Sequence, residues 1–256
     1  MSDADGEAIS LPSPFRVLAH DSVGSTSDEA KTLAEQGAAH GTIVWAIEQT
    51  KGRGRLDRNW VSPRGNLFMS AVLRPDVTPA RAAELGFVAS LAVSDMVASF
   101  LPDPARVQLK WPNDVLVDGA KLSGILLEAR SAPSGKVEWV VLGIGVNIVS
   151  APTGTPYPAT FLHALGGGLP DAREALDALG AALAARIAEW QARGFAPIRQ
   201  NWLIRARGIG QVLEVRQGAV PLTGRFRDLD PDGALLLETD RGLRRITAGD
   251  VYFPEP

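Results

Sequence analysis

The sequence predicts an α/β domain with a mixed sheet, followed by a small β-barrel. Two observations lead to this prediction. Segments with a helical period alternate with β-branched, apolar segments in the first part of the chain, whereas after Trp202 short strands are separated by tight turns. We therefore divide the 256 residues into a domain over 1–204 and a barrel over 205–256. A chain of this length buries enough apolar surface to fold without disulfides or structural metals.

The first helix is expected over residues 27–36. Thr26 and Glu29 have the spacing of a capping box, which satisfies free backbone groups at a helix start. Two strands are expected next, over 42–48 and 67–73, because both segments are rich in β-branched or aromatic residues. A glycine- and arginine-rich loop separates them.

A long helix is expected from Thr78 to Phe100. Pro79 suits its first turn, and apolar residues then recur with the helical period. A short strand over 107–111 and a hairpin over 115–129 follow, and the hairpin turns at Asp118-Gly119.

A buried strand over 137–148 and an alanine-rich helix over 171–193 complete the first domain. The barrel is expected to contain short strands at 211–216, 222–227, 234–238 and 244–247.

Composition excludes several classes of function. The chain has 26 basic and 29 acidic residues, a net charge of −3, which argues against a protein that coats nucleic acid. It has no cysteine, so thiolate chemistry and cysteine zinc sites are excluded, and its three histidines lack ligand spacing. The N-terminus has no signal-peptide pattern, and the most apolar stretch, 139–149, is too short to cross a bilayer. We expect a cytoplasmic protein without membrane contact.

The segment from Gln49 to Trp60 is the strongest candidate for chemistry. Four of the eight residues in 51–58 are cationic and two are glycine. Glycines allow close approach of the backbone to a ligand, and arginine forks fit phosphate or carboxylate groups. The alternative is a solvated basic loop without a ligand.

Three further segments carry polar groups at strand ends. Lys-Trp-Pro-Asn-Asp (110–114) ends a strand, Lys121 begins another with Gly124 three residues later, and Gly-Ile-Gly-Val-Asn (143–147) combines small residues with an amide. Each has a structural alternative: a turn cap, a surface lysine, and simple strand packing.

In this order the motifs Gly-Arg-Gly-Arg-x-x-Arg-x-Trp (52–60), Lys-Trp-Pro-Asn-Asp and Lys-x-x-Gly-Ile-Leu (121–126) are highly specific. The chain resembles the biotin protein ligases, biotin–[acetyl-CoA-carboxylase] ligases, in the form that lacks an N-terminal DNA-binding domain. The resemblance implies a mixed-sheet catalytic domain related to class II aminoacyl-tRNA synthetases, plus a C-terminal SH3-like barrel. It also implies an ATP-dependent ligase that forms biotinyl-5′-AMP, with Mg²⁺ as cofactor, and then biotinylates a specific lysine of a carrier protein.

The resemblance also implies roles for individual residues. Lys121 is expected to be the main catalytic residue, assisted by Arg53, Arg55 and Arg58. The residues expected to bind biotin are Ser25, Thr26, Ser27, Gln49, Gly52, Arg53, Gly54, Arg55, Lys121 and Gly124. Those expected to bind the nucleotide are Arg55, Arg58, Trp60, Lys110, Asn113, Asp114 and Asn147. Asp114 is a candidate ligand for Mg²⁺, or a group that orients the attacking lysine. Ser27 stands where the family often has asparagine.

The implied partner is the biotin carboxyl carrier domain of acetyl-CoA carboxylase or of a related carboxylase. Only 24 residues precede Ser25, too few for a helix-turn-helix unit, so we expect no binding to an operator. The family includes monomers and dimers, which leaves a homodimer open. Two alternative functions compete with this one: a lipoate–protein ligase, whose catalytic domain is related, and a non-catalytic nucleic-acid-binding protein that uses the arginine-rich loop.

Overall fold

A computed structural model of the chain describes residues 9–155, 157–217 and 220–253. In chain order, its strands and α-helices are β1 (Arg16–Val23), α1 (Thr26–Glu35), β2 (Thr42–Gln49), β3 (Leu67–Leu73), α2 (Pro79–Ala83), α3 (Leu85–Phe100), β4 (Val107–Lys110), β5 (Asp114–Val117), β6 (Ala120–Ser131), β7 (Val137–Val146), α4 (Ala172–Arg193), α5 (Phe195–Ile204), β8 (Val212–Arg216), β9 (Leu222–Leu229), β10 (Leu235–Thr239), β11 (Gly242–Ile246) and β12 (Asp250–Tyr252).

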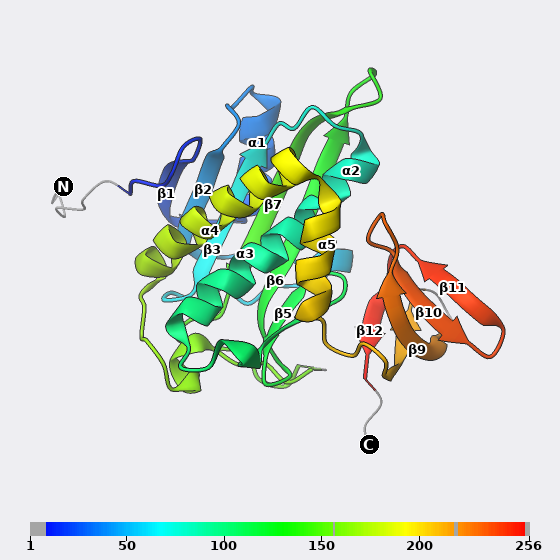
Figure 1. Cartoon of the computed structure of the whole chain (residues 1–256). Helices are drawn as coiled ribbons and strands as arrows, with labels where there is room; N and C mark the ends of the chain where they lie inside the picture. The colour runs from blue at the N-terminus through cyan, green and yellow to red at the C-terminus, as the bar shows by residue number, and fades with distance from the viewer. Residues whose placement is uncertain (1–8, 156, 218–219, 254–256) are drawn as a thin grey trace, which may run out of the picture.

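The first domain is built on a seven-stranded sheet with the order β1-β2-β3-β7-β6-β5-β4. Strands β1 and β2 are parallel, and the other neighbours are antiparallel. Helices α3, α4 and α5 cover one face of this sheet, whereas α1 packs against β2, β3 and β7 (Figure 1). The predicted mixed-sheet α/β domain is confirmed.

The C-terminal domain is a five-stranded antiparallel sheet with the order β11-β10-β9-β8-β12. This arrangement is consistent with the predicted SH3-like barrel. Helix α5 ends at Ile204 and β8 begins at Val212, so the predicted boundary after residue 204 falls in the segment that connects them.

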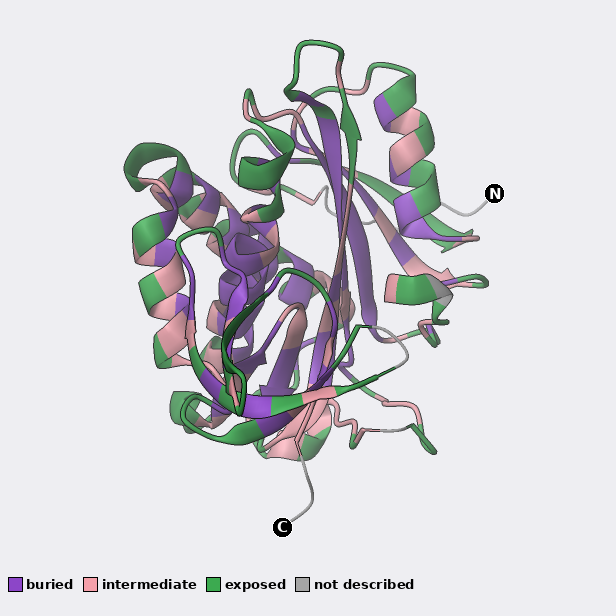
Figure 2. Ribbon diagram, turned by 90° about the vertical axis from the view of Figure 1, so that its right-hand side faces the viewer, coloured by how far each residue is buried: buried purple, intermediate pink, exposed green. Residues whose placement is uncertain are grey.

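The two faces of the large sheet carry different residues because side chains alternate along each strand. On β3, Leu67, Met69, Ala71 and Leu73 belong to the main core beneath α3 and α4, whereas Val72 belongs to a smaller cluster beneath α1. Figure 2 shows that the central strands and the helix surfaces facing them are buried.

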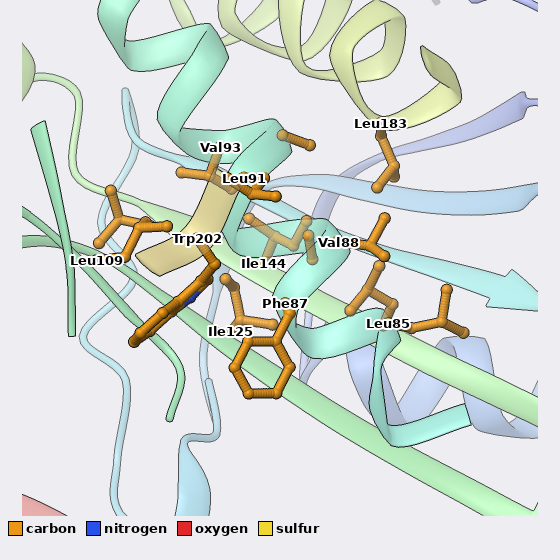
Figure 3. Close-up of a cluster of buried hydrophobic side chains, with 14 of the residues drawn as sticks. Leu85, Phe87, Val88, Leu91, Val93, Leu109, Ile125, Ile144, Leu183 and Trp202 are labelled. Carbon is orange, nitrogen blue, oxygen red and sulfur yellow. The ribbon is translucent and has the colours of Figure 1, made fainter. Parts of the chain in front are cut away.

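The main core is centred on α3. Phe87, Val88 and Leu91 of this helix are buried, and the ring of Phe87 contacts that of Trp202 edge to face (Figure 3). The Phe87 ring also contacts that of Phe195 edge to face. Because α3 is buried on most sides, its sequence is apolar almost throughout rather than on one stripe. By length and composition alone, the stretch Pro79–Phe100 would pass as a membrane span, and its burial between the sheet and α4 accounts for that character.

The structure differs from the sequence-based elements in four places. The predicted helix over 78–100 is two helices. At their junction the backbone N–H groups of Glu84 and Phe87 donate to carbonyls three residues earlier, those of Arg81 and Glu84, and these bonds tighten the chain. Strand β1, helix α5 and strand β12 were not predicted. Strand β1 is an exposed edge strand without clear alternation, α5 follows Gly194 and contains Pro197, and β12 has only three residues.

Trp111 joins the two domains. Its buried indole N–H donates a hydrogen bond to the carbonyl of Gly233 in the barrel, 3.1 Å away. Gly233 has a φ of +86°, and a side chain there would meet Phe87, so the barrel backbone comes close to α3 at this point. The tryptophan of the Lys-Trp-Pro-Asn-Asp segment is therefore a contact between domains.

We predict that Trp111→Phe lowers the free energy of unfolding by about 1–2 kcal/mol more than Trp139→Phe does. Both indoles are buried, but among the described residues that of Trp139 has no hydrogen-bond partner, so its replacement loses volume alone. Denaturant unfolding of both variants measures the difference. Equal losses would mean that the bond to Gly233 contributes nothing to stability.

Candidate active site

A cavity of about 310 Å³ opens on the face of the large sheet that α1 partly covers. Its walls come from α1, the end of β2 and the loop after it, strands β4, β5, β6 and β7, the segments 152–155 and 157–159, and the barrel. The lining residues are Thr26, Ser27, Gln49, Arg53, Gly54, Arg55, Arg58, Asn59, Trp60, Val61, Lys110, Asn113, Asp114, Lys121, Gly124, Ile125, Leu126, Gly143, Ile144, Gly145, Asn147, Pro152, Thr155, Tyr157, Ala159 and Asp250.

The hollow exists because the strands beneath it carry glycine. Gly124 of β6 is paired with Gly145 of β7, and Gly143 lies two residues earlier on the same face. A Cβ at Gly145 would lie 2.5 Å from the Trp60 indole, and one at Gly143 would lie 2.6 Å from the Ser27 hydroxyl. Larger residues would therefore fill the cavity or displace its walls.

The inner end of the cavity is lined by hydroxyl and amide groups. The Gln49 side-chain oxygen accepts hydrogen bonds from the Thr26 backbone N–H at 2.8 Å and from the Thr26 hydroxyl at 3.1 Å. Ser70 of β3 bonds to the hydroxyls of both Thr26 and Ser27, at 2.9 and 3.1 Å. This network fixes polar groups that can still donate to or accept from a small ligand, because each hydroxyl has more than one bonding position.

Arg53 is held at one side of the cavity by two carboxylates. Its guanidinium lies 2.7 Å from Glu128 of β6 and 3.0 Å from Asp28 of α1. Lys31 contacts the same two carboxylates, at 3.1 and 3.0 Å. Arg53 therefore anchors the start of the loop to two regular elements.

Arg55 and Arg58 are held on the other side, by the barrel. Arg58 pairs with Asp250 at 2.5 Å, and Arg55 lies 3.7 Å from the same carboxylate. Arg55 also donates to the Asn113 side chain at 3.0 Å and to the Gly249 carbonyl at 3.4 Å. Burial lowers the pKa of the Arg55 guanidinium, and Asp250 opposes this shift.

Two lysines share one carboxylate in the middle of the cavity. Asp114 lies 2.5 Å from the Lys121 ammonium and 3.6 Å from that of Lys110. Lys110 is 6% exposed and lies 3.6 Å above the ring of Tyr157. Burial lowers the pKa of Lys110 to about 8, although Asp114 opposes the shift. Burial also raises the pKa of Tyr157, whose hydroxyl donates to the carbonyl of Val251 in the barrel.

Several buried polar atoms of the lining have no hydrogen-bond partner among the described residues. They are the Trp60 indole nitrogen, the Asn147 side-chain oxygen, the Nε of Arg53 and the Oδ1 of Asp114, which is ion-paired with Lys121. The Asn147 amide nitrogen is bonded to the carbonyl of Thr160 at 3.1 Å, so its oxygen is free to accept from a ligand amino group. Unpartnered buried groups in a cavity are typical of ligand contacts.

The structure brings the predicted site residues together, with two exceptions. Ser25 precedes the first turn of α1 and is buried, but it does not line the cavity. Gly52 also lies behind the wall, where a Cβ would meet the Trp60 carbonyl and the Ser62 hydroxyl. Trp60, predicted near the adenine, packs against Gly124 and Gly145 on the sheet.

Sequence reasoning missed Ser70, Tyr157 and Asp250. Ser70 is a polar residue within an otherwise apolar strand, and this pattern could have indicated a functional role. Tyr157 and Asp250 belong to segments without a recognisable motif. Their contribution depends on how distant segments pack.

The residues of the site fit a protein-bound metal ion poorly. Among the described residues, no cluster of three or more carboxylate, histidine or cysteine groups could hold a metal. Asp114, the candidate ligand, is already paired with two lysines. Its position suits the orientation of Lys121 and Lys110 better.

Comparison with known proteins gives two family matches. The model of the Biotin/lipoate A/B protein ligase family matches residues 21–147, and that of the Biotin protein ligase C terminal domain matches residues 208–253. Among curated proteins, the chain is 41% identical over 234 residues to a biotin–[acetyl-CoA-carboxylase] ligase of Paracoccus denitrificans, which covers 90% of this chain and 97% of the relative. It is 34% identical to the bifunctional ligase/repressor BirA of Bacillus subtilis, over 92% of this chain and 73% of the relative.

Among solved structures, the fold is similar to that of the biotin protein ligase from Aquifex aeolicus in complex with biotin and ATP. The TM-score is 0.79 at 28% sequence identity, and the similarity covers 92% of this chain and 97% of the other.

We predict that Lys110→Met stabilises the fold at pH 7, by about 1–3 kcal/mol. The pKa of Lys110 falls from 10.5 to about 8 on folding, so the unfolded chain binds more protons between these pH values. Below pH 8 the wild type carries the full cost of a charged Lys110, and its stability rises with pH from about 8 to 10.5. The advantage of the variant should therefore vanish as the pH approaches 10.5.

Denaturant unfolding at pH 7 and pH 10 measures this effect. Lys136→Met serves as the control, because Lys136 is about half exposed and, within the described part of the chain, its ammonium pairs with Asp76 alone at the surface. A Lys110→Met variant less stable than the wild type at pH 7 would contradict the prediction.

Proposed function

We propose that the active site of this chain uses separate residues for its separate tasks. The chain belongs to the biotin/lipoate A/B protein ligase family and is a biotin protein ligase. It activates biotin with ATP as biotinyl-5′-AMP and transfers the biotinyl group to a lysine of a biotin carboxyl carrier protein. Different residues of the cavity serve the binding of biotin, the activation step and the transfer step.

The observation that carries the assignment is the contrast between the two ends of one cavity. The inner end offers the hydroxyls of Thr26 and Ser27 and the amide of Gln49, groups that match the N–H and carbonyl groups of the biotin ureido ring. The lining also includes the apolar sheet residues Ile125, Leu126 and Ile144, which suit the thioether ring of biotin. The outer end offers the arginines and lysines that a carboxylate and a triphosphate require.

The first step needs a biotin carboxylate oxygen held against the α-phosphorus while pyrophosphate leaves. No enzyme nucleophile is involved, so catalysis consists of positioning and charge stabilisation. Lys121 suits the position between carboxylate and α-phosphate, because Asp114 holds its ammonium and its backbone bonds to Pro158 and Thr160 fix the start of β6. Arg55 and Arg58 would bind the β- and γ-phosphates, and Asn147 would accept from the adenine amino group.

In the second step the carrier lysine attacks the acyl carbon, and the bond to the AMP oxygen breaks. Asp114 would orient the incoming lysine and take up the proton that its ammonium must lose before the free amine attacks, because this carboxylate already holds two lysine ammoniums. The carrier identity, the cytoplasmic location, the absence of operator binding and a homodimer all remain predictions. Magnesium would enter with the phosphates of ATP, whose oxygens are its preferred ligands.

Two alternatives fit the site less well. Lipoate has no ureido group to satisfy the hydroxyls at the inner end. For a nucleic-acid-binding protein, the loop arginines should be free to contact phosphates at the surface, but Arg53 is held by two carboxylates and Arg58 is paired with Asp250.

We predict ATP–pyrophosphate exchange that depends on biotin. Purified protein with Mg²⁺ should exchange labelled pyrophosphate into ATP when biotin is added, and neither lipoate nor the absence of an acid should support it. Exchange with lipoate alone would overturn the substrate assignment. If the folded protein is inactive with both acids, it does not catalyse adenylation, and the alternative of a nucleic-acid-binding protein becomes the preferred one.

We predict that Lys121→Ala slows adenylate formation by about 100- to 1,000-fold, the loss typical of removing one charge-stabilising group. Single-turnover formation of biotinyl-5′-AMP measures it. Lys136→Ala, on the surface and paired with Asp76, should retain the wild-type rate. If the rate for Lys121→Ala is within a few-fold of the wild-type rate, Lys121 is not a catalytic residue for adenylate formation.

A further inference from the structure

The barrel contributes one charged side chain to the cavity. Asp250 begins β12, and its carboxylate is 19% exposed. Among the described residues, its only ion-pair partners are Arg58 at 2.5 Å and Arg55 at 3.7 Å. Asp250 therefore faces the loop of the catalytic domain rather than a partner in its own domain.

The loop arginines differ in how firmly they are held. Arg53 is fixed by two carboxylates, those of Asp28 and Glu128, and neither of these lines the cavity. Arg58 is half exposed and has Asp250 as its single carboxylate partner among the described residues. Between Arg55 and Arg58, Leu56 has a φ of +54° and is 73% exposed, so little apolar packing holds the tip of the loop.

Charge balance in the cavity explains why a carboxylate is present here. Five cationic side chains line it, against the carboxylates of Asp114 and Asp250: Arg53, Arg55, Arg58, Lys110 and Lys121. Without a ligand, Asp250 reduces the repulsion between Arg55 and Arg58. When phosphates enter, the same carboxylate becomes a like charge beside them.

We propose that Asp250 competes with pyrophosphate for Arg55 and Arg58. In the ligand-free chain the carboxylate pairs with both arginines, and on ATP binding the arginines exchange it for phosphate oxygens. After adenylation, the return of the arginines to Asp250 assists the departure of pyrophosphate. Asp250 is thus a positioning residue that acts through two arginines, and this role rests on the proposed function.

The test compares Asp250→Asn with the wild type and with Asp228→Asn. Asp228 is the matched control, because it also joins the barrel to the catalytic domain, through Arg199 at 2.7 Å, but it does not line the cavity. Calorimetry with inorganic pyrophosphate and Mg²⁺ gives the dissociation constant directly. ATP–pyrophosphate exchange gives the KM for ATP, and calorimetry with biotin gives a reference affinity.

Asp250→Asn should bind pyrophosphate about three- to tenfold more tightly and show a KM for ATP lowered to a similar extent. Biotin affinity should be unchanged, and Asp228→Asn should match the wild type in every measurement. Unchanged or weaker pyrophosphate binding by Asp250→Asn would overturn the proposal. Equal tightening in Asp228→Asn would also overturn it, because a loosened barrel would then be the cause.

A second measurement uses the wild type alone, in case Asp250→Asn does not fold. Adding pyrophosphate should increase hydrogen exchange of the backbone amides in 249–252, while that of 222–229 should not change. No change in 249–252 would contradict the proposal. If the wild type lacks biotin-dependent exchange, the proposed function fails, whereas the binding and hydrogen-exchange results still decide the role of Asp250.

Discussion

The pairing of glycine with glycine on two central strands is the constraint on which the site depends. A sheet face normally becomes buried against a helix, and here α3 and α4 cover the core side of the sheet. On the other face, Gly124 and Gly145 lie side by side, with the Trp60 indole above both and the Lys121 side chain beside Gly124. The short helix α1 covers the neighbouring strands, so an open hollow remains beside it. Loops and the barrel can reach this hollow, and they bring the charged groups to it.

A cavity that concentrates positive charge must balance it in the ligand-free protein. Isolated buried cations are costly, and Lys110 shows this cost in its lowered pKa. The balancing carboxylates come from separate elements: Glu128 from β6, Asp114 from β5 and Asp250 from β12. The electrostatics of the site therefore exist only when the sheet, the loop and the barrel are assembled. This gives the barrel a direct contact with the reaction site in addition to its packing against α5.

Much of the catalytic domain could be predicted because its signals are local. The strands over 42–49, 67–73 and 137–146 are apolar and β-branched, and the loop between the first two concentrates glycine and arginine in a few residues. Other features have no local signal. Strand β1 is recognised only by its parallel pairing with β2, and Asp250 only by the arginines it meets from nearly two hundred residues earlier in the chain.

Motif-based expectations also do not separate residues that line the cavity from residues that lie behind its wall. Gly52 belongs to the most specific motif, but its lack of a side chain allows the chain to pass Trp60 and Ser62 behind the cavity. Ser25 occupies the N-cap position just before α1 and is likewise absent from the cavity lining. At the inner end, polar groups are fixed by hydrogen bonds between a helix and two strands, and such preorganisation favours recognition of one ring system. At the outer end, long arginine side chains on a loop keep exchangeable partners, which suits a reaction in which phosphates arrive, react and leave. Selectivity and turnover thus depend on different degrees of stiffness within one cavity.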